Sequence, residues 1–272
     1  MKIGVVGCTG RMGQMLIRQI VGTAGCVLAG GVDRPASPAI GKDLGTLIGL
    51  EALGLSVGED PVALFAASDA VIDFTVPAAS IQHAHLAAQA QTILVVGTTG
   101  LSRDQEAELF RAARYTPIVQ SANMSLGVNI LLAAVEQVAR ALGPEVDIEI
   151  LEMHHRYKVD APSGTALALG RAAAAGRGVD LDQVAVRSRD GLTGPRRRGD
   201  IGFAALRGGD VVGDHSVIFA ADGERVELSH RASDRSIFAR GAVAAARWAA
   251  GKPPGLYGMR DVLGMATPAA TG

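Results

Sequence analysis

The chain has few aromatic residues, few cysteines and no excess of either charge. Phe, Trp and Tyr make up only 4% of its 272 residues, whereas hydrophobic residues make up 48%. The core must therefore be built from Ala, Val, Leu and Ile, which is typical of buried parallel strands covered by helices. This length allows one large domain or two moderate ones, with a substantial hydrophobic core.

These shortages exclude several classes of protein. Lys and Arg total 26 and Asp and Glu total 27, so the net charge of −1 provides no positive field for nucleic acid. The two cysteines, Cys8 and Cys26, fit neither a zinc site nor a disulfide framework, and we expect reduced thiols in a cytoplasmic protein. No stretch approaches the roughly 18 consecutive apolar residues of a membrane span. We therefore expect neither a nucleic-acid nor a membrane partner.

The first half of the chain alternates short apolar runs with helical segments. Strands are predicted over 3–6, 27–32, 69–74, 92–96 and 117–120, and helices after Gly13 and over 78–90 and 102–114. Residues 35–60 are rich in Gly, Pro and Ser and are interpreted as a loop that contains a short helix or strand. Ser102 is expected to cap its helix, with Glu106 near the capping-box position. The alternation predicts an α/β fold with a Rossmann-like, doubly wound parallel sheet.

A glycine-rich loop, Gly7-Cys-Thr-Gly10-Arg-Met-Gly13, joins the first strand to the first helix. Glycines allow close approach of the backbone, and the helix N-terminus presents N–H groups to a pyrophosphate. Asp33 ends the second strand at the spacing where a carboxylate binds the adenosine ribose, whereas the guanidinium of Arg34 suits a 2′-phosphate. NADH and NADPH therefore both stay open. The spacing GxxGxxG differs from the standard GxGxxG, so a tight turn without a ligand is the alternative.

Ligands of doubly wound sheets bind beyond the carboxyl ends of the strands. Small and hydroxyl residues gather at these ends, where a nicotinamide ring and a ribose need close backbone approach. The residues predicted to bind the cofactor are Gly7, Cys8, Thr9, Gly10, Arg11, Met12, Asp33, Arg34, Gly97, Thr98, Thr99, Ser121, Ala122, Asn123 and Met124.

Residues 152–165, E-M-H-H-R-Y-K-V-D-A-P-S-G-T, carry a dense group of ionisable side chains. An amphipathic helix predicted over 126–142 and a half-buried strand over 147–153 lead into them. His154 and Lys158 lie four apart across a turn and can converge on one substrate as proton donors. Ser163 is a natural N-cap for a helix over 165–176, and the N–H groups of Gly164 and Thr165 form a seat for a carboxylate.

Metal binding is the competing interpretation of the neighbouring pair His154 and His155. Adjacent residues on a strand point to opposite faces, so these two side chains cannot easily share an ion. His83 and His85 are two apart on a predicted helix, do not share a face, and are interpreted as surface or boundary residues. No metal site is therefore predicted. A purely structural role for the two histidines, and a plain helix cap at Ser163, are the remaining alternatives.

After residue 176 the pattern becomes β. Alternating runs at 183–189, 200–207, 211–221 and 224–233 are separated by Gly-Gly-Asp and Asp-Gly turns, which favour hairpins. We expect a second α+β domain with a mostly antiparallel open sheet, followed by a helix over 234–250. The loop at Arg196–Arg198 is interpreted as a solvated loop or a subunit contact in preference to a substrate-binding one. Residues 265–272 are expected to fray.

Taken together, these motifs resemble the dihydrodipicolinate reductase family. The stretch 152–167 is similar to the family's signature, and the resemblance includes GCTGRMG at 7–13, DFT at 73–75, GTTG at 97–100, SANMSLGVN at 121–129, GDIGFAALRGGDVVGDH at 199–215 and GLYGMRDVLG at 255–264. It implies NADH- or NADPH-dependent reduction of 4-hydroxy-tetrahydrodipicolinate, a small cyclic imine with two carboxylates, to tetrahydrodipicolinate. Water is lost, and the reaction belongs to lysine and diaminopimelate biosynthesis.

The resemblance also implies roles and organisation. It makes His154 the acid/base and Lys158 the proton donor, with substrate contacts from His155, Ser163, Gly164, Thr165 and Arg235. It implies a homotetramer built by the second sheet. It further implies a discontinuous dinucleotide-binding domain, 1–125 and 235–272, around a substrate-binding and oligomerisation domain, 126–234. Asp33 stands where other members can carry Glu, which leaves the choice between NADH and NADPH open.

Two other functions fit parts of the sequence. A different oxidoreductase of a small dicarboxylate, such as an aspartate-type dehydrogenase, would share the glycine loop but gives no reason for the motif at 152–165. A nucleotide-sensing regulatory protein would bind the cofactor without turnover and would not need His154 and Lys158. The presence of these two side chains favours the enzyme.

Overall fold

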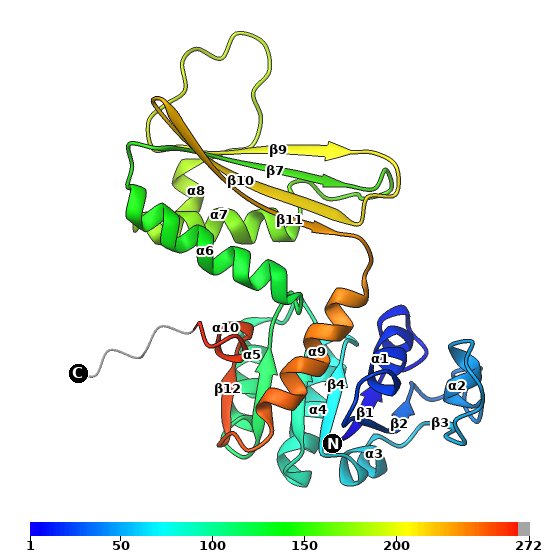
Figure 1. Cartoon of the computed structure of the whole chain (residues 1–272). Helices are drawn as coiled ribbons and strands as arrows, with labels where there is room; N and C mark the ends of the chain where they lie inside the picture. Colours follow the sequence, from blue (N-terminus) through cyan, green and yellow to red (C-terminus); the bar gives the residue numbers. More distant parts are fainter. Residues whose placement is uncertain (266–272) are drawn as a thin grey trace. The chain divides into compact units, whose positions relative to one another are not determined.

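The computed structural model describes residues 1–265, which form two compact units (Figure 1). The first unit combines Met1–Leu126 with the segment that begins at Ser236, and the second comprises Gly127–Arg235. Most of the segment predicted to fray, residues 266–272, lies outside the described residues. No helix between residues 1 and 265 combines the length and the apolar character that crossing a membrane requires.

The first unit is built on a seven-stranded sheet in which every neighbouring pair is parallel. Its order is β12-β6-β5-β4-β1-β2-β3. The order reverses between β1 and β4, the place where doubly wound sheets bind their ligands. The predicted Rossmann-like sheet is therefore confirmed. Its strands are β1 (Lys2–Val6), β2 (Val27–Val32), β3 (Val57–Gly58), β4 (Ala70–Asp73), β5 (Ile93–Val96), β6 (Pro117–Gln120) and β12 (Gly255–Tyr257).

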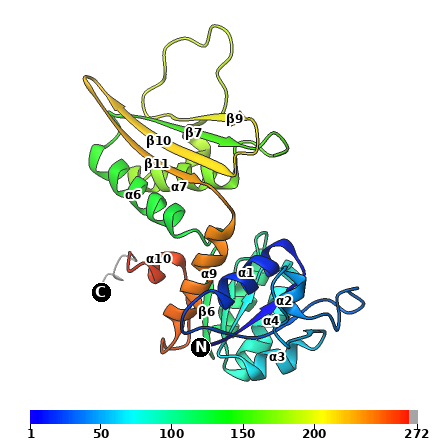
Figure 2. The same cartoon turned by 45° about the vertical axis from the view of Figure 1, so that its right-hand side comes forward.

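Helices cover both faces of this sheet. On one face lie α1 (Arg11–Val21) and α9 (Ser236–Ala249), which pack side by side (Figure 2). On the other lie α3 (Pro61–Ala67), α4 (Pro77–Ala90) and α5 (Arg103–Ala112), and the helices α2 (Leu44–Leu47) and α10 (Met259–Val262) are short. Helix α9 can pack closely because its buried positions carry small side chains, at Ala239, Ala242, Ala245, Ala246 and Ala249.

The structure differs from the predictions for this unit in three details. Helix α3 was not predicted; Asp60 caps it and a proline opens it. The capping box of α5 is completed by Gln105 and not by Glu106, because the N3 position is three residues after the cap at Ser102. His83 is buried and not at the surface, and its Nδ1 lies 2.8 Å from Asp73 Oδ2.

The second unit is a five-stranded sheet with α6 (Leu126–Leu142) and α7 (Gly164–Arg177) along one face (Figure 1). Its strands are β7 (Asp147–His154), β8 (Ala185–Val186), β9 (Ile201–Arg207), β10 (Gly213–Ala221) and β11 (Glu224–Ala232), in the order β11-β10-β7-β9-β8. The short helix α8 (Leu181–Val184) precedes β8. Ile148, Ile150, Phe203, Val217 and Phe219 form much of the core between sheet and helices.

This second sheet is mixed. β10 is antiparallel to β7 and β11, but β9 runs parallel to β7 and β8 parallel to β9. The hairpin expected at Asp222-Gly223 is confirmed by the pairing of β10 with β11. The hairpin expected at 208–210 is wrong, because β9 and β10 lie on opposite sides of β7. Turn residues alone could not show that a third strand is inserted between the two.

The charged loop at Arg196–Arg198 is bound to this sheet and is not merely solvated. Arg196 donates to Asp147 Oδ1 at 2.7 Å and to Glu149 Oε1 at 3.0 Å, and also to the backbone carbonyls of Arg197, Ile148 and Asp200. Arg198 pairs with Glu145. These contacts hold the loop against β7.

Candidate active site

The glycine loop follows β1 and leads into α1, as predicted. Gly7 has φ of +66°, a conformation that favours glycine. A Cβ at Gly13 would lie 2.3 Å from the carbonyl oxygen of Gly7, so the helix packs directly on the loop backbone. Gly10 is the N-cap of α1 and provides no side chain to cap it. The loop thus combines close packing with an N-terminus open to an anion.

Asp33 ties the end of β2 to this loop. Its Oδ2 accepts hydrogen bonds from the backbone N–H of Thr9, at 3.0 Å, and from the Thr9 hydroxyl. Its Oδ1 accepts from the N–H of Arg34 at 2.7 Å. The Arg34 side chain is exposed, and within residues 1–265 its guanidinium forms no hydrogen bond or ion pair. The carboxylate and the guanidinium therefore lie directly after β2, at the strand end that dinucleotide-binding folds commonly use for the adenosine ribose.

The other predicted cofactor residues differ in exposure, and Met12, Gly97, Ser121 and Asn123 are half-buried. Arg11, Thr99 and Ala122 are exposed at the strand ends, and Ser121 Oγ donates to the carbonyl of Asn123 to close a turn. The side chains of Cys8, Thr98 and Met124 are buried, so they shape the loops from beneath. Burial, with help from the negative charge of Asp33, raises the pKa of the Cys8 thiol to about 12, so it stays protonated.

Asp73, at the end of β4, connects these loops from below. It is fully buried and accepts hydrogen bonds from the Thr75 N–H and hydroxyl, at 2.8 and 2.6 Å, and from Thr98. Burial raises its pKa, but the bonds from His83 and then Thr75 outweigh it and hold the pKa below the usual value. A Cβ at Gly7 would lie 2.8 Å from the Thr75 methyl group. Asp73 therefore supports the glycine loop and the loop at Thr98 together, a role the sequence did not reveal.

In the second unit, the covered face of β7 changes from apolar to ionisable along its length. Its alternate residues Ile148, Ile150, Glu152 and His154 are all buried. The two isoleucines belong to the core, whereas Glu152 and His154 lie at the carboxyl end of the strand. His154 Nδ1 lies 2.6 Å from Glu152 Oε2. The stretch singled out in the sequence thus begins on the inner face of the sheet.

Glu152 is surrounded by hydrogen-bond donors. Arg207 binds it through two N–H groups, at 2.7 and 2.9 Å, and the backbone N–H of Ser163 donates to it at 3.1 Å. Burial raises the pKa of Glu152, but the bonds from Arg207, then His154 and Ser163, hold it below the ordinary value. The carboxylate is therefore ionised at neutral pH, beside the imidazole of His154.

His215 completes a cluster that also contains Glu152, His154, Ser163 and Arg207, and that we call the Glu152 cluster. The register places His215 opposite Glu152 on β10, and its ring lies edge-on to that of His154, with centroids 5.1 Å apart. Its Nε2 is 3.0 Å from Ser163 Oγ. Burial is the main cause that lowers the pKa of His215 to about 4, and repulsion from the neighbouring His154 when that ring is protonated is a smaller one. His215 is therefore neutral under ordinary conditions.

Ser163 is the N-cap of α7, as predicted. Its buried hydroxyl accepts a hydrogen bond from the N–H of Ala166 at 3.1 Å. The same hydroxyl therefore caps the helix and contacts His215. Gly164 and Thr165 are the first two residues of α7, and Gly164 is exposed with nothing within 4 Å of an added Cβ. The helix N-terminus therefore has room for an anion above these residues.

The remaining predicted residues of this unit lie nearby or at its end. Lys158 Nζ forms an ion pair with Asp160 Oδ1 at 2.7 Å, and Arg207 donates to the carbonyl of Asp160, which links Lys158 to the Glu152 cluster. His155 follows His154 directly after β7. Arg235 is exposed after β11, and no contact found within residues 1–265 joins it to this cluster. Among the same residues, no group of His, Cys, Asp and Glu could hold a metal ion.

Sequence reasoning missed Glu152, Arg207 and His215 as members of the site. The alternation Ile-x-Ile-x-Glu-x-His in β7 was a usable signal for Glu152, because it places an acid on the core face beside His154. Arg207 and His215 lie directly opposite His154 and Glu152 on the neighbouring strands. Only the strand register reveals them.

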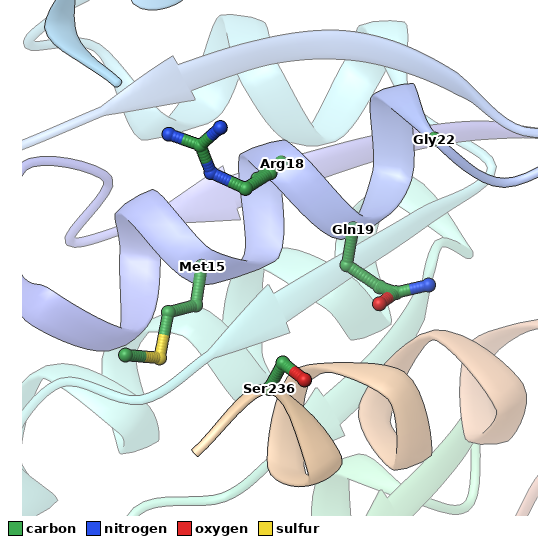
Figure 3. Close-up of a pocket in the computed structure, with 5 residues that line it drawn as sticks. All are labelled: Met15, Arg18, Gln19, Gly22 and Ser236. Carbon is green, nitrogen blue, oxygen red and sulfur yellow. The ribbon is translucent and has the colours of Figure 1, made fainter. Parts of the chain in front are cut away.

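A hollow of about 200 Å³ lies elsewhere in the first unit (Figure 3). Met15, Arg18, Gln19 and Gly22 line it from α1 and its end, and Ser236 from the start of α9. None of the predicted site residues lines it. The Arg18 guanidinium is bound to the carbonyl of Ile48, so it is already used in holding the loop after α2.

Comparisons with known proteins cover nearly the whole chain. A family model described as "Dihydrodipicolinate reductase, N-terminus" matches residues 1–124, and one described as "Dihydrodipicolinate reductase, C-terminus" matches residues 127–263. A 4-hydroxy-tetrahydrodipicolinate reductase of Rhizobium rhizogenes is 60% identical over 98% of each chain. One of Brucella abortus is 59% identical over 98% of this chain and 100% of its own.

A solved structure supports the fold. It is a dipicolinate-bound dihydrodipicolinate reductase from Paenisporosarcina sp. TG-14, with a TM-score of 0.77. It is 22% identical, and the match covers 96% of this chain and 98% of that one.

Proposed function

The chain belongs to the dihydrodipicolinate reductase family, and from this premise we propose that it reduces 4-hydroxy-tetrahydrodipicolinate to tetrahydrodipicolinate in lysine and diaminopimelate biosynthesis. It is an oxidoreductase that uses a nicotinamide dinucleotide, and the substrate loses its 4-hydroxyl as water. The observation that carries the proposal is the cluster in the second unit. An imidazole held by a buried carboxylate lies beside the N-terminus of a capped helix, which suits protonation of a carboxylate-bearing ring.

The first unit provides the seat for the dinucleotide. The residues that would hold it are those of the glycine loop from Gly7 to Met12, Asp33 and Arg34, Gly97 to Thr99, and Ser121 to Met124. The fit is supported by the absence of Cβ atoms where α1 meets the loop, and by the uncapped N-terminus of α1. When bound there, the cofactor supplies the hydride.

We propose that both NADH and NADPH are accepted. Asp33 supports NADH, because a carboxylate at the end of β2 can accept hydrogen bonds from ribose hydroxyls. However, both of its oxygens already accept bonds from the loop, at Thr9 and Arg34. The exposed guanidinium of Arg34 supports NADPH, because it can bind a 2′-phosphate.

The second unit provides the groups that bind and protonate the substrate. The N–H groups of Gly164 and Thr165 bind one carboxylate at the start of α7, and His155, Ser163 and Arg235 complete the substrate contacts. Hydride addition to the conjugated imine leaves electron density in the ring that must be protonated. His154 acts as the acid/base and Lys158 as the proton donor.

Two further properties of the family pattern stay predictions for this chain: assembly into a homotetramer through the second sheet, and a cytoplasmic location. The sheet face opposite α6 and α7 carries exposed Leu206, on β9, which is compatible with coverage by another subunit. Light scattering on the purified chain tests the tetramer, and a monomer at micromolar concentration would contradict it.

A coupled assay tests the proposed function. The substrate is made in place from pyruvate and aspartate semialdehyde by the preceding synthase, and the oxidation of NADH and of NADPH is followed separately. We expect oxidation of both cofactors, each dependent on the synthase. Oxidation of neither would contradict the proposal, and oxidation of NADH alone would remove the proposed role of Arg34.

A further inference from the structure

One buried carboxylate, that of Glu152, connects the proposed acid/base, His154, to the start of α7. Glu152 is 1% exposed. Its Oε2 lies 2.6 Å from His154 Nδ1 and 2.7 Å from a guanidinium nitrogen of Arg207. Its Oε1 lies 3.1 Å from the N–H of Ser163 and 2.9 Å from the other terminal nitrogen of Arg207. Each carboxylate oxygen thus contacts one terminal nitrogen of Arg207. In addition, Oε2 contacts the His154 ring and Oε1 contacts the N–H of Ser163.

This arrangement leaves the carboxylate no freedom to rotate. A buried charge without partners is very costly, so the four bonds must form together. A bidentate guanidinium also fixes the plane of the carboxylate, which a lysine could not do. Because the plane is fixed, the positions of the His154 ring and of the Ser163 N–H are fixed relative to one another.

We propose that Glu152 is a positioning residue for the reaction, one that keeps the proton of the neutral His154 ring on Nδ1 and holds that ring at a set distance from the carboxylate seat on α7. His154 then exchanges protons with the substrate through Nε2. Arg207 acts through Glu152, by holding its carboxylate. This inference rests on the proposed function, since it assigns Glu152 to the same site.

The surroundings of His154 agree with this assignment. A ring nitrogen's protonation is set by the hydrogen bond that the other nitrogen makes, and an ionised carboxylate can only accept. On the other side, a Cβ added to Gly213 would lie 3.0 Å from Nε2, so the glycine leaves space beside that nitrogen. Glu152 therefore occupies one nitrogen, and the sheet leaves room beside the other.

The same strand offers a matched control in Glu149. Its carboxylate is also bound by arginines, with Arg189 at 2.8 and 2.9 Å and Arg196 at 3.0 Å. It lies on the opposite face of β7 from His154, and its hydrogen bonds reach neither His154 nor Ser163. Glu149→Gln therefore removes an arginine-paired carboxylate from β7 without touching the proposed network.

The test compares Glu152→Gln with Glu149→Gln in turnover, in NADH binding and in the ¹⁵N NMR shifts of the His154 ring. In Glu152→Gln, we expect kcat to fall on the order of 10²-fold, since small misplacements of a reacting group have effects of that size. The dissociation constant of NADH stays unchanged. The ¹⁵N shifts, assigned with a His154→Asn sample, show the Nδ1–H form in the wild type and lose it in Glu152→Gln. Glu149→Gln keeps both kcat and the Nδ1–H form.

Other outcomes overturn the inference. A kcat for Glu152→Gln within about twofold of the wild type would do so, as would an unchanged tautomer. An equal loss of kcat in both variants would mean that Glu152 merely supports β7. If Glu152→Gln does not fold, Arg207→Lys takes its place, and we expect kcat to fall about tenfold. A lysine keeps the positive charge but lacks the planar guanidinium that binds both carboxylate oxygens. A wild-type chain that turns over no substrate would instead contradict the proposed function itself.

Discussion

At the scale of single residues, the proposed acid/base His154 is held by partners that the fold brings to it: Glu152 lies 2.6 Å from its Nδ1, and Arg207 binds that carboxylate through two hydrogen bonds. His154, Lys158 and the cap at Ser163 could be predicted because proton donors and N-caps have recognisable types and spacings. Arg207 and His215 could not, because they join Glu152 and His154 through the pairing of neighbouring strands, which the local sequence pattern does not determine. Glu152 left a signal that was missed, as an acid on the core face of β7 two residues before His154.

A pH-dependent stability follows from His215. In the unfolded chain its ring protonates near its ordinary pKa of 6.5, whereas burial lowers the folded pKa to about 4. Between these pH values the unfolded chain binds one more proton at His215 than the folded chain does. The contribution of the neutral, buried ring to the free energy of unfolding is therefore fully present above pH 6.5 and is lost as the pH falls to 4. The contribution is on the order of 3 kcal/mol.

Denaturant unfolding near pH 7 and near pH 4.5 measures this loss, with His215→Gln as the control. The glutamine keeps a hydrogen-bonding group near Ser163 but does not titrate. We expect the variant to lose less stability on acidification than the wild type, while losses from groups such as Asp73 and Glu152 are common to both. Equal losses in the two chains would show that His215 is not buried as described.

At the scale of elements, local pattern predicted most helices and strands to within about two residues, but not how the strands pair. The helix over 126–142 and the strand over 117–120 match the structure, because long amphipathic periods and short apolar runs are strong signals. The hairpin expected at 208–210 is wrong, because β7, from much earlier in the chain, lies between β9 and β10. Partner choice depends on tertiary packing, which turn residues do not encode.

Gly13 tests the proposed role of the glycine loop. A Cβ there would lie 2.3 Å from the Gly7 carbonyl oxygen and 2.6 Å from Cys8 Cα, both backbone atoms. Gly13→Ala must therefore separate α1 from the loop, and we expect a loss of about 1–3 kcal/mol in stability together with at least about tenfold weaker NADH binding.

Gly22→Ala is the matched control, since it ends the same helix and its Cβ would meet no heavy atom closer than 3.4 Å. NADH titration by fluorescence, with thermal unfolding alongside, compares the two variants. Normal NADH binding by Gly13→Ala would mean that the close contact between α1 and the loop does not form the cofactor seat.

At the scale of the whole molecule, the two units have different proposed tasks. The first carries the residues predicted to bind the dinucleotide, and the second carries the proposed proton donors and the proposed carboxylate seat. The Rossmann-like sheet and the family could be predicted from the sequence, because their motifs are dense and specific. The support beneath the loops could not, since the buried network of Asp73, Thr75 and His83 joins residues from different elements.

The division of tasks is tested most directly by Lys158→Met, measured for turnover and for NADH binding in the same preparation. Lys158 is proposed to donate a proton and belongs to the second unit, so its loss should spare the cofactor. We predict that kcat falls at least about 10²-fold, the usual contribution of a general acid, while the dissociation constant of NADH stays unchanged. Turnover close to that of the wild type would contradict the assignment of Lys158. An equal loss of NADH binding would contradict the division between the units.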